Sequence, residues 1–144
     1  MYKQILLAYD GSQAGQKALL DCQDIVQWSG AALTLVAVMP KEIVFGVAEG
    51  GFYDPENHAR EKKSYKSVLE QGLRSLTDAG FKVSGEVLVG DSVHEISSFA
   101  RKISADLIVV GHKHQKSWVA RWWGGSGSSA LVEHAPCSVL MVIT

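Results

Sequence analysis

Residues 106–144 read DLIVVGHKHQKSWVARWWGGSGSSALVEHAPCSVLMVIT, and this stretch decides the fold. The apolar run at 107–110 is short and rich in β-branched residues, which indicates a buried strand rather than a helix. A glycine-serine segment then opens a short helical pattern that Pro136 ends. A second apolar run, Ser138–Ile143, closes the stretch. The order strand, glycine-containing loop, helix, strand predicts a βαβ unit.

The start of the helix in this unit is a candidate site for a phosphate. The first backbone N–H groups of a helix lack partners and its dipole places partial positive charge there, so anions suit this end. Gly125 and Gly127 let the backbone approach a phosphate closely, while Ser126 and Ser128 add hydroxyl donors. A serine-capped helix after a flexible turn is the alternative interpretation of the same run.

The rest of the chain repeats the alternation of strand and helix. Apolar runs at 5–9 and 32–39, and a partly alternating run at 81–89, predict three more strands, the last nearer an edge of the sheet. Five strands alternating with four helices predict a parallel sheet covered on both faces, a single doubly wound α/β domain over residues 1–144. In the common order 2-1-3-4-5 or a close variant, ligands lie beyond the carboxyl ends of the strands where the chain reverses direction. If the first and fourth strands flank that point, Asp10 and Gly111 meet at its mouth.

Polar residues and glycines mark the ends of the predicted helices. Ser12 is the expected N-cap of the first helix, and Gly30 is its C-terminal stop. A long amphipathic helix is predicted from about residue 56 to 79. Ser92 and Glu95 match a capping box for the helix that follows the third strand.

Composition limits the classes of function. The chain has 144 residues, 47% of them hydrophobic, and a formal net charge of -1, so it has no overall attraction to nucleic acid or membranes. No apolar run approaches the roughly 20 residues of a membrane span, and no signal peptide precedes the first strand, so a cytoplasmic location is expected. Cys22 and Cys137 lack CxxC spacing and are interpreted as two small buried hydrophobic residues without a disulfide.

Several features together resemble one known family, the universal stress proteins. They are an aspartate after the first strand, a Val-Gly pair before a helix, a glycine after the fourth strand with a Gly-Ser pair downstream, and the segment HAPCSVL at 134–140. In this sequence they are Asp10, Val89 and Gly90, Gly111 with Gly125 and Ser126, and residues 134–140. The resemblance covers the whole chain. It implies a flavodoxin-like sheet of order 3-2-1-4-5, related to the adenine nucleotide alpha hydrolases, and a homodimer formed through the last strand, Ser138–Ile143.

One branch of that family binds ATP through a motif written Gly-x2-Gly-x9-Gly-Ser/Thr. Gly111 matches the first glycine, and His114 stands where the second would be. Gly125 and Ser126 match the Gly-Ser pair that ends the motif once one extra residue is allowed in the loop before them. Gly127 and Ser128 continue the turn that faces the phosphates.

The resemblance also implies contacts for the rest of the nucleotide. It implies that Asp10 contacts the adenosine part, that Val38 touches adenine through its backbone, and that Ala8 lies on the adenine side. The sequence thus predicts a universal stress protein acting as a nucleotide-responsive regulatory module, with ATP and Mg²⁺ as its ligands.

A dimeric interaction protein of the same fold that binds no nucleotide is the alternative. In that interpretation Trp118, Trp122 and Trp123 pack on the domain, on a second subunit or on an unknown protein partner. The His112-x-His114 pair lacks further ligands nearby in sequence, so no metal site is predicted. The motifs GxGxxG, GxxxxGK[ST] and GxSxG are absent, which argues against a dinucleotide-binding domain, a Walker-type NTPase and a serine hydrolase, and no catalytic activity is expected.

Overall fold

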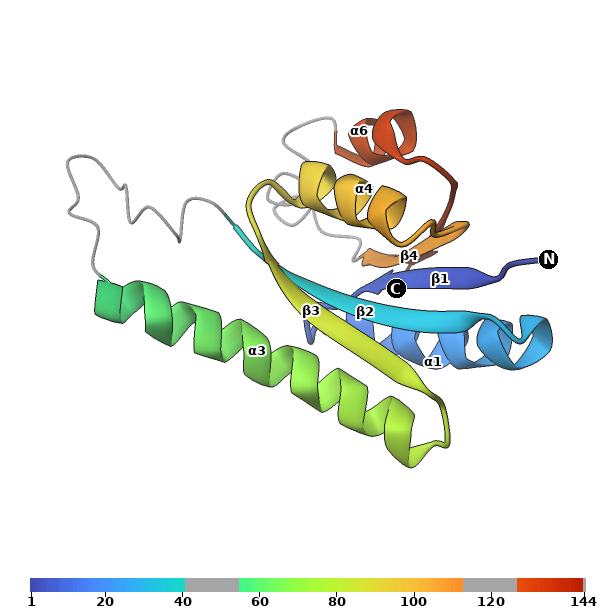
Figure 1. The fold of residues 1–144 in the computed structure, drawn as a ribbon, viewed down its shortest axis with the longest axis horizontal. Helices are drawn as coiled ribbons and strands as arrows, with labels where there is room; N and C mark the ends of the chain where they lie inside the picture. The colour runs from blue at the N-terminus through green and yellow to red at the C-terminus, as the bar shows by residue number, and fades with distance from the viewer. Residues whose placement is uncertain (41–54, 113–126, 144) are drawn as a thin grey trace.

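Five parallel strands form one sheet in the order β3-β2-β1-β4-β5, the order that the resemblance implied (Figure 1). The computed structural model describes residues 1–40, 55–112 and 127–143. The strands are β1 (Gln4–Ala8), β2 (Ala32–Met39), β3 (Val83–Val89), β4 (Leu107–His112) and β5 (Ser138–Ile143). The helices are α1 (Gln13–Ser29), α3 (Pro55–Asp78), α4 (Ser92–Lys102) and α6 (Gly127–His134). The alternation predicted from the sequence is therefore confirmed.

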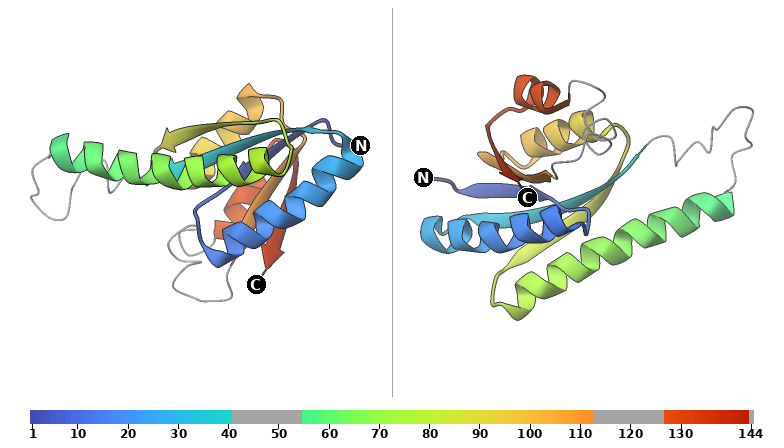
Figure 2. Two further views of the ribbon diagram at one scale, coloured as in Figure 1. Left: turned by 90° about the horizontal axis from the view of Figure 1, so that it is seen from below. Right: turned by 180° about the vertical axis from the view of Figure 1, so that it is seen from behind.

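Helices cover both faces of the sheet. Figures 1 and 2 show α1 and α3 on one face and α4 and α6 on the other. Alternate residues of β1 supply the two apolar layers, with Ile5 and Leu7 packed toward α1 and α3, and Leu6 and Ala8 toward α4 and α6. Because both faces are buried, the central strands are continuously apolar, as the sequence showed.

The carboxylate of Asp106 joins the start of β4 to the start of β1. It accepts the N–H of Lys3 at 2.8 Å and that of Gln4 at 3.0 Å. Burial raises the pKa of this carboxyl group, but hydrogen bonds from the amides of Lys3, Gln4 and Asp106 itself outweigh that effect and hold the pKa below its ordinary value. These bonds span more than 100 residues of sequence, and they help to make β4 the neighbour of β1.

The predicted caps of α1 are confirmed. The Ser12 hydroxyl accepts the N–H of Gly15 at 3.0 Å. Gly30 has φ 69°, the left-handed conformation in which its N–H reaches the carbonyl of Val26.

The predicted capping box of α4 is wrong by one residue. Asp91 is the N-cap, and its carboxylate accepts the N–H of His94 at 3.0 Å. Asp caps a helix as well as Ser, and Gly90, at φ 144°, turns the chain just before it. Ser92 is thus the first residue of the helix, and Glu95 does not stand three positions after the cap.

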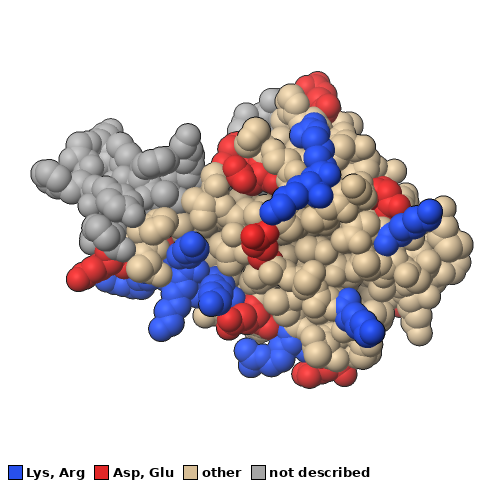
Figure 3. All heavy atoms as spheres, viewed as in Figure 1, with Lys and Arg blue, Asp and Glu red and all other residues tan. Residues whose placement is uncertain are grey.

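The described surface mixes charges of both signs. On the face shown in Figure 3, Lys and Arg alternate with Asp and Glu. None of the helices within residues 1–40, 55–112 and 127–143 has the length and apolar character to cross a membrane. Cys22 is buried and free, and burial, with a smaller contribution from Asp21, raises the pKa of its thiol to about 12. Cys137 is also free but only partly buried, so the expectation of two buried cysteines holds for Cys22 alone.

Candidate functional site

The carboxyl ends of β1 and β4 meet at the first turn of α1. β1 pairs with β2 on one side and with β4 on the other, so the chain reverses direction across the sheet between β1 and β4. Ligands of doubly wound domains lie at such a point. Asp10 and Gly111 both contact the start of α1 here, as the sequence predicted for this strand arrangement.

Asp10 is held by the residues that follow it. Its Oδ1 accepts the backbone N–H of Ser12 at 2.9 Å and the Ser12 hydroxyl at 2.6 Å. Gly11 turns the chain between them with φ 79°. Within the described residues no hydrogen bond reaches Oδ2 of Asp10, so this oxygen can accept a hydrogen bond from a ligand.

Gly111 lets α1 approach the end of β4. A Cβ at this position would lie 2.4 Å from the carbonyl oxygen of Ala14 and 2.7 Å from the amide nitrogen of Gly15. Both neighbours are backbone atoms of a helix, so neither can move aside without shifting α1. The first glycine of the predicted motif therefore has a packing role in this chain, independent of any phosphate.

Gly15 is a site residue that sequence reasoning missed. A Cβ there would lie 2.6 Å from Oδ1 of Asp10, the oxygen that holds Ser12. The sequence feature that could have indicated this role is a glycine in the first turn of a helix, where alanine would be more stable by about 1 kcal/mol.

Two small apolar side chains lie on the α4 and α6 face of the sheet near this edge. Ala8 and Val38 are both buried members of the same apolar layer, on the adjacent strands β1 and β2. Tyr9 belongs to the opposite layer, and burial, followed by the charge of Asp10, raises the pKa of its phenol. Ala8, Val38 and Asp10 thus come from neighbouring strand ends.

The phosphate side of the predicted site is only partly described. His114, Gly125, Ser126 and the three tryptophans lie outside the described residues. Gly127 and Ser128 begin α6, so the glycine-serine run does open a helix as the sequence predicted. Residues 1–40, 55–112 and 127–143 contain no group of three His, Cys, Asp or Glu that could hold a metal ion.

Comparison with known proteins identifies the family. The sequence model of the universal stress protein family matches residues 1–142. The chain belongs to the universal stress protein family. A universal stress protein relative from Staphylococcus epidermidis is 34% identical over 149 aligned residues, which cover 99% of this chain and 85% of that protein. The crystal structure of a Burkholderia pseudomallei family member superposes with a TM-score of 0.73 at 26% identity, over 96% of this chain and 95% of that one.

Some universal stress proteins of this fold are solved as nucleotide complexes. The Archaeoglobus fulgidus protein in complex with dAMP has a TM-score of 0.68 at 19% identity, covering 98% of each chain. An Arabidopsis thaliana member with AMP bound has a TM-score of 0.65 at 18% identity, over 98% of this chain and 91% of that one. At these identities the likeness establishes the shared fold.

Proposed function

We propose that this universal stress protein is a regulatory module that binds an adenine nucleotide, ATP with Mg²⁺, at the carboxyl edge of β1 and β4. The observation that carries the proposal is the geometry of Asp10. One carboxylate oxygen is fixed by Ser12, while the other accepts no hydrogen bond from the described residues. A ribose hydroxyl is a suitable donor for that second oxygen.

The neighbouring residues support the same ligand. In this proposal Val38 meets adenine through its backbone and Ala8 lies on the adenine side, on the adjacent strands β2 and β1 that lead to Asp10. Gly127 and Ser128 stand at the start of α6, where unpaired N–H groups suit phosphates. In this proposal Gly125 and Ser126 also bind the phosphates. Gly111 and His114 stand at the first and second glycine positions of the family's ATP-binding motif. The AMP and dAMP complexes of structural relatives support an adenine nucleotide as the class of ligand.

Asp10→Asn tests the proposal by changing the free oxygen while keeping the other. The amide oxygen can still accept from Ser12, but its NH₂ group cannot accept from the ribose, so we expect ATP affinity to fall about tenfold. Titration calorimetry with ATP, with and without Mg²⁺, measures the change. Asp21→Asn, on the exposed part of α1, removes the same charge and should bind as the wild type does.

A second variant tests the phosphate side of the proposed site, and the measurement on the wild-type protein tests the proposal as a whole. Gly125→Val should abolish ATP binding without unfolding the domain, because a branched side chain blocks backbone approach to the phosphates. Absence of any heat of binding in the wild type would contradict the proposal. It would favour the alternative, a dimeric interaction protein that binds no nucleotide but contacts a protein partner. Native mass spectrometry of the purified protein would distinguish the two directly through carried-over nucleotide.

We also propose that the protein forms a homodimer through β5 and acts in the cytoplasm. β5 is an edge strand: it pairs with β4, and no other described strand covers its free side. Free N–H and C=O groups on such an edge invite a second strand, and a two-fold antiparallel pairing of two β5 strands would satisfy both copies.

Ile143→Lys is expected to shift this dimer toward monomer, because a charge on an edge strand opposes strand pairing. The side chain is 51% exposed, so the change should leave the fold intact. Leu20→Lys is the matched control, since it adds the same charge at a side chain that is 60% exposed on α1, outside the edge strand. Light scattering at micromolar concentration measures the masses. A monomeric wild type would refute the dimer.

A further inference from the structure

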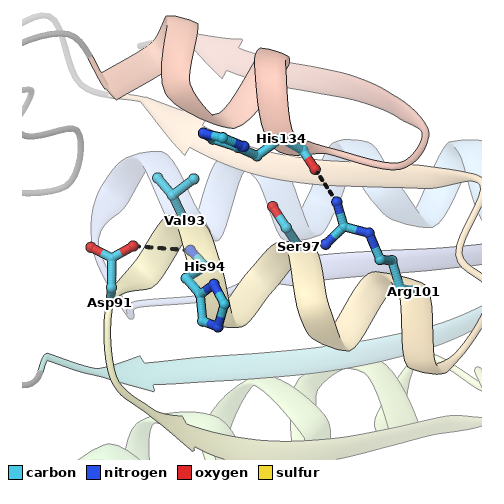
Figure 4. Close-up of a pocket in the computed structure, with 6 residues that line it drawn as sticks. All are labelled: Asp91, Val93, His94, Ser97, Arg101 and His134. Carbon is cyan, nitrogen blue, oxygen red and sulfur yellow. Dashed lines mark hydrogen bonds between the residues drawn. The ribbon is translucent and has the colours of Figure 1, made fainter.

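A pocket lies between α4 and α6, lined by none of the residues of the proposed nucleotide site. It has a volume of about 180 Å³. Figure 4 shows its lining, five residues from α4 and its cap together with the last residue of α6: Asp91, Val93, His94, Ser97, Arg101 and His134. No local pattern connects Arg101 with His134, because they are 33 positions apart in the chain.

The α4 side chains of the pocket share one face of the helix. His94, Ser97 and Arg101 follow the spacing i, i+3, i+7, which aligns them along the axis. Figure 4 shows the Ser97 hydroxyl and the Arg101 guanidinium directed toward α6. Nη2 of Arg101 donates to the backbone carbonyl of His134 at 2.8 Å, so the guanidinium is held against the end of α6. Its other N–H groups are left for a further acceptor.

Ser97 is the observation that points to a ligand. The residue is 2% exposed, and its Oγ has no hydrogen-bond partner among the described residues. Leaving a hydroxyl buried and unpaired costs about 1–3 kcal/mol, so such a group calls for a partner that the protein itself does not supply. A ligand that accepts a hydrogen bond would remove this cost.

The charges of the pocket select an oxyanion. Arg101 carries a positive charge, and the ring of His134, on the α6 side of the pocket, adds an N–H donor, whereas the ring of His94 points away from α6 (Figure 4). Asp91 already caps α4 through His94, and the helix rise of about 1.5 Å per residue places it about 15 Å along the axis from Arg101. Its negative charge is therefore remote from the basic end. The pocket is smaller than the roughly 300–1,000 Å³ of sites for drug-sized ligands, which suits a single small group.

We propose that this pocket binds a small oxyanion of the phosphate class, held by Arg101, Ser97 and the ring of His134. The proposal is independent of nucleotide binding at the carboxyl edge of β1 and β4. A guanidinium and a hydroxyl that both donate to one anion give charge-assisted hydrogen bonds, which are about twice as strong as neutral ones.

The test is an NMR titration of the histidine rings with inorganic phosphate, at ionic strength held constant with sodium chloride. We expect the resonances of His134 to shift and saturate in the millimolar range, while those of His58, on α3 across the sheet, stay unchanged. Adding AMP in a separate arm shows whether a nucleotide phosphate reaches the same pocket. Failure of the His134 ring to respond to phosphate would overturn the proposal.

Two variants and a control make the test specific. Arg101→Gln and Ser97→Ala should each weaken phosphate binding about tenfold, the effect of one lost hydrogen bond to a charged group. Lys102→Gln removes the same charge from the adjacent residue, whose Nζ lies 5.7 Å from the centroid of the Phe99 ring, and should leave the affinity within about twofold. Equal effects of Arg101→Gln and Lys102→Gln would mean general charge attraction and would overturn the site. So would an unchanged affinity in Ser97→Ala.

Discussion

Gly111→Ala is expected to destabilise the folded protein by about 3 kcal/mol, at the upper end of the cost of overpacking a core. The added Cβ would meet the carbonyl oxygen of Ala14 at 2.4 Å, and relief requires α1 to move away from β4. Urea denaturation followed by circular dichroism measures the loss. Because the first turn of α1 also holds Asp10, the variant should bind ATP more weakly even where it remains folded.

Gly30→Ala separates steric crowding from backbone conformation. Gly30 has φ 69° but no atom within 4 Å of an added Cβ, so alanine there costs only the left-handed conformation, about 1 kcal/mol. If Gly111→Ala and Gly30→Ala lower the free energy of unfolding equally, the close approach of α1 to Gly111 does not cause the loss predicted for Gly111→Ala.

Leu131→Ala is the second change with a large expected effect. Leu131 of α6 is fully buried, at 0% exposure, in the layer that also contains Ile96, Phe99 and Ala100 of α4. Replacing a buried leucine with alanine costs about 2–5 kcal/mol through lost transfer energy and the cavity that remains. We expect the free energy of unfolding to fall by about 3 kcal/mol, measured by the same denaturation experiment, and α6 to pack less firmly on the sheet.

Val132→Ala is the matched control for this prediction. It shortens the next side chain of α6, which is 64% exposed, and should change stability by less than about 0.5 kcal/mol. The Leu131 variant should also bind both ATP and phosphate less well, because α6 supplies the helix start of one proposed site and His134 of the other. Equal stability losses for the two variants would show that α6 is not anchored through Leu131.

The sequence by itself determined the elements of this protein. The apolar runs of β2 and β5 coincide with the observed strands, Ala32–Met39 and Ser138–Ile143. β2 is buried along almost its whole length, and a strand buried on both faces is marked by its own composition. The caps Ser12 and Gly30 were also readable, since a cap bonds to residues a few positions away. The glycine-serine run was placed correctly at the start of α6 for the same reason.

The order of the strands and the geometry of the sites depended on contacts between distant parts of the chain. Alternation alone allowed 2-1-3-4-5 as well as 3-2-1-4-5, and only the family resemblance selected the second order. The observed neighbours β1 and β4 are joined by bonds such as those from Lys3 and Gln4 to Asp106. The neighbouring residues Asp91 and Ser92 could each cap α4, and in the folded chain Asp91 takes that position.

Only the tertiary structure brought together the groups that make the two proposed sites. The packing of Gly111 against Ala14 depends on how closely a helix approaches a strand nearly 100 residues away, a distance that no local pattern encodes. Likewise, Arg101 and His134 carry no ligand spacing in sequence and become neighbours because α4 and α6 cover the same face of the sheet. Local patterns record each residue's nearest neighbours along the chain, whereas a site is formed by side chains that folding brings near one another.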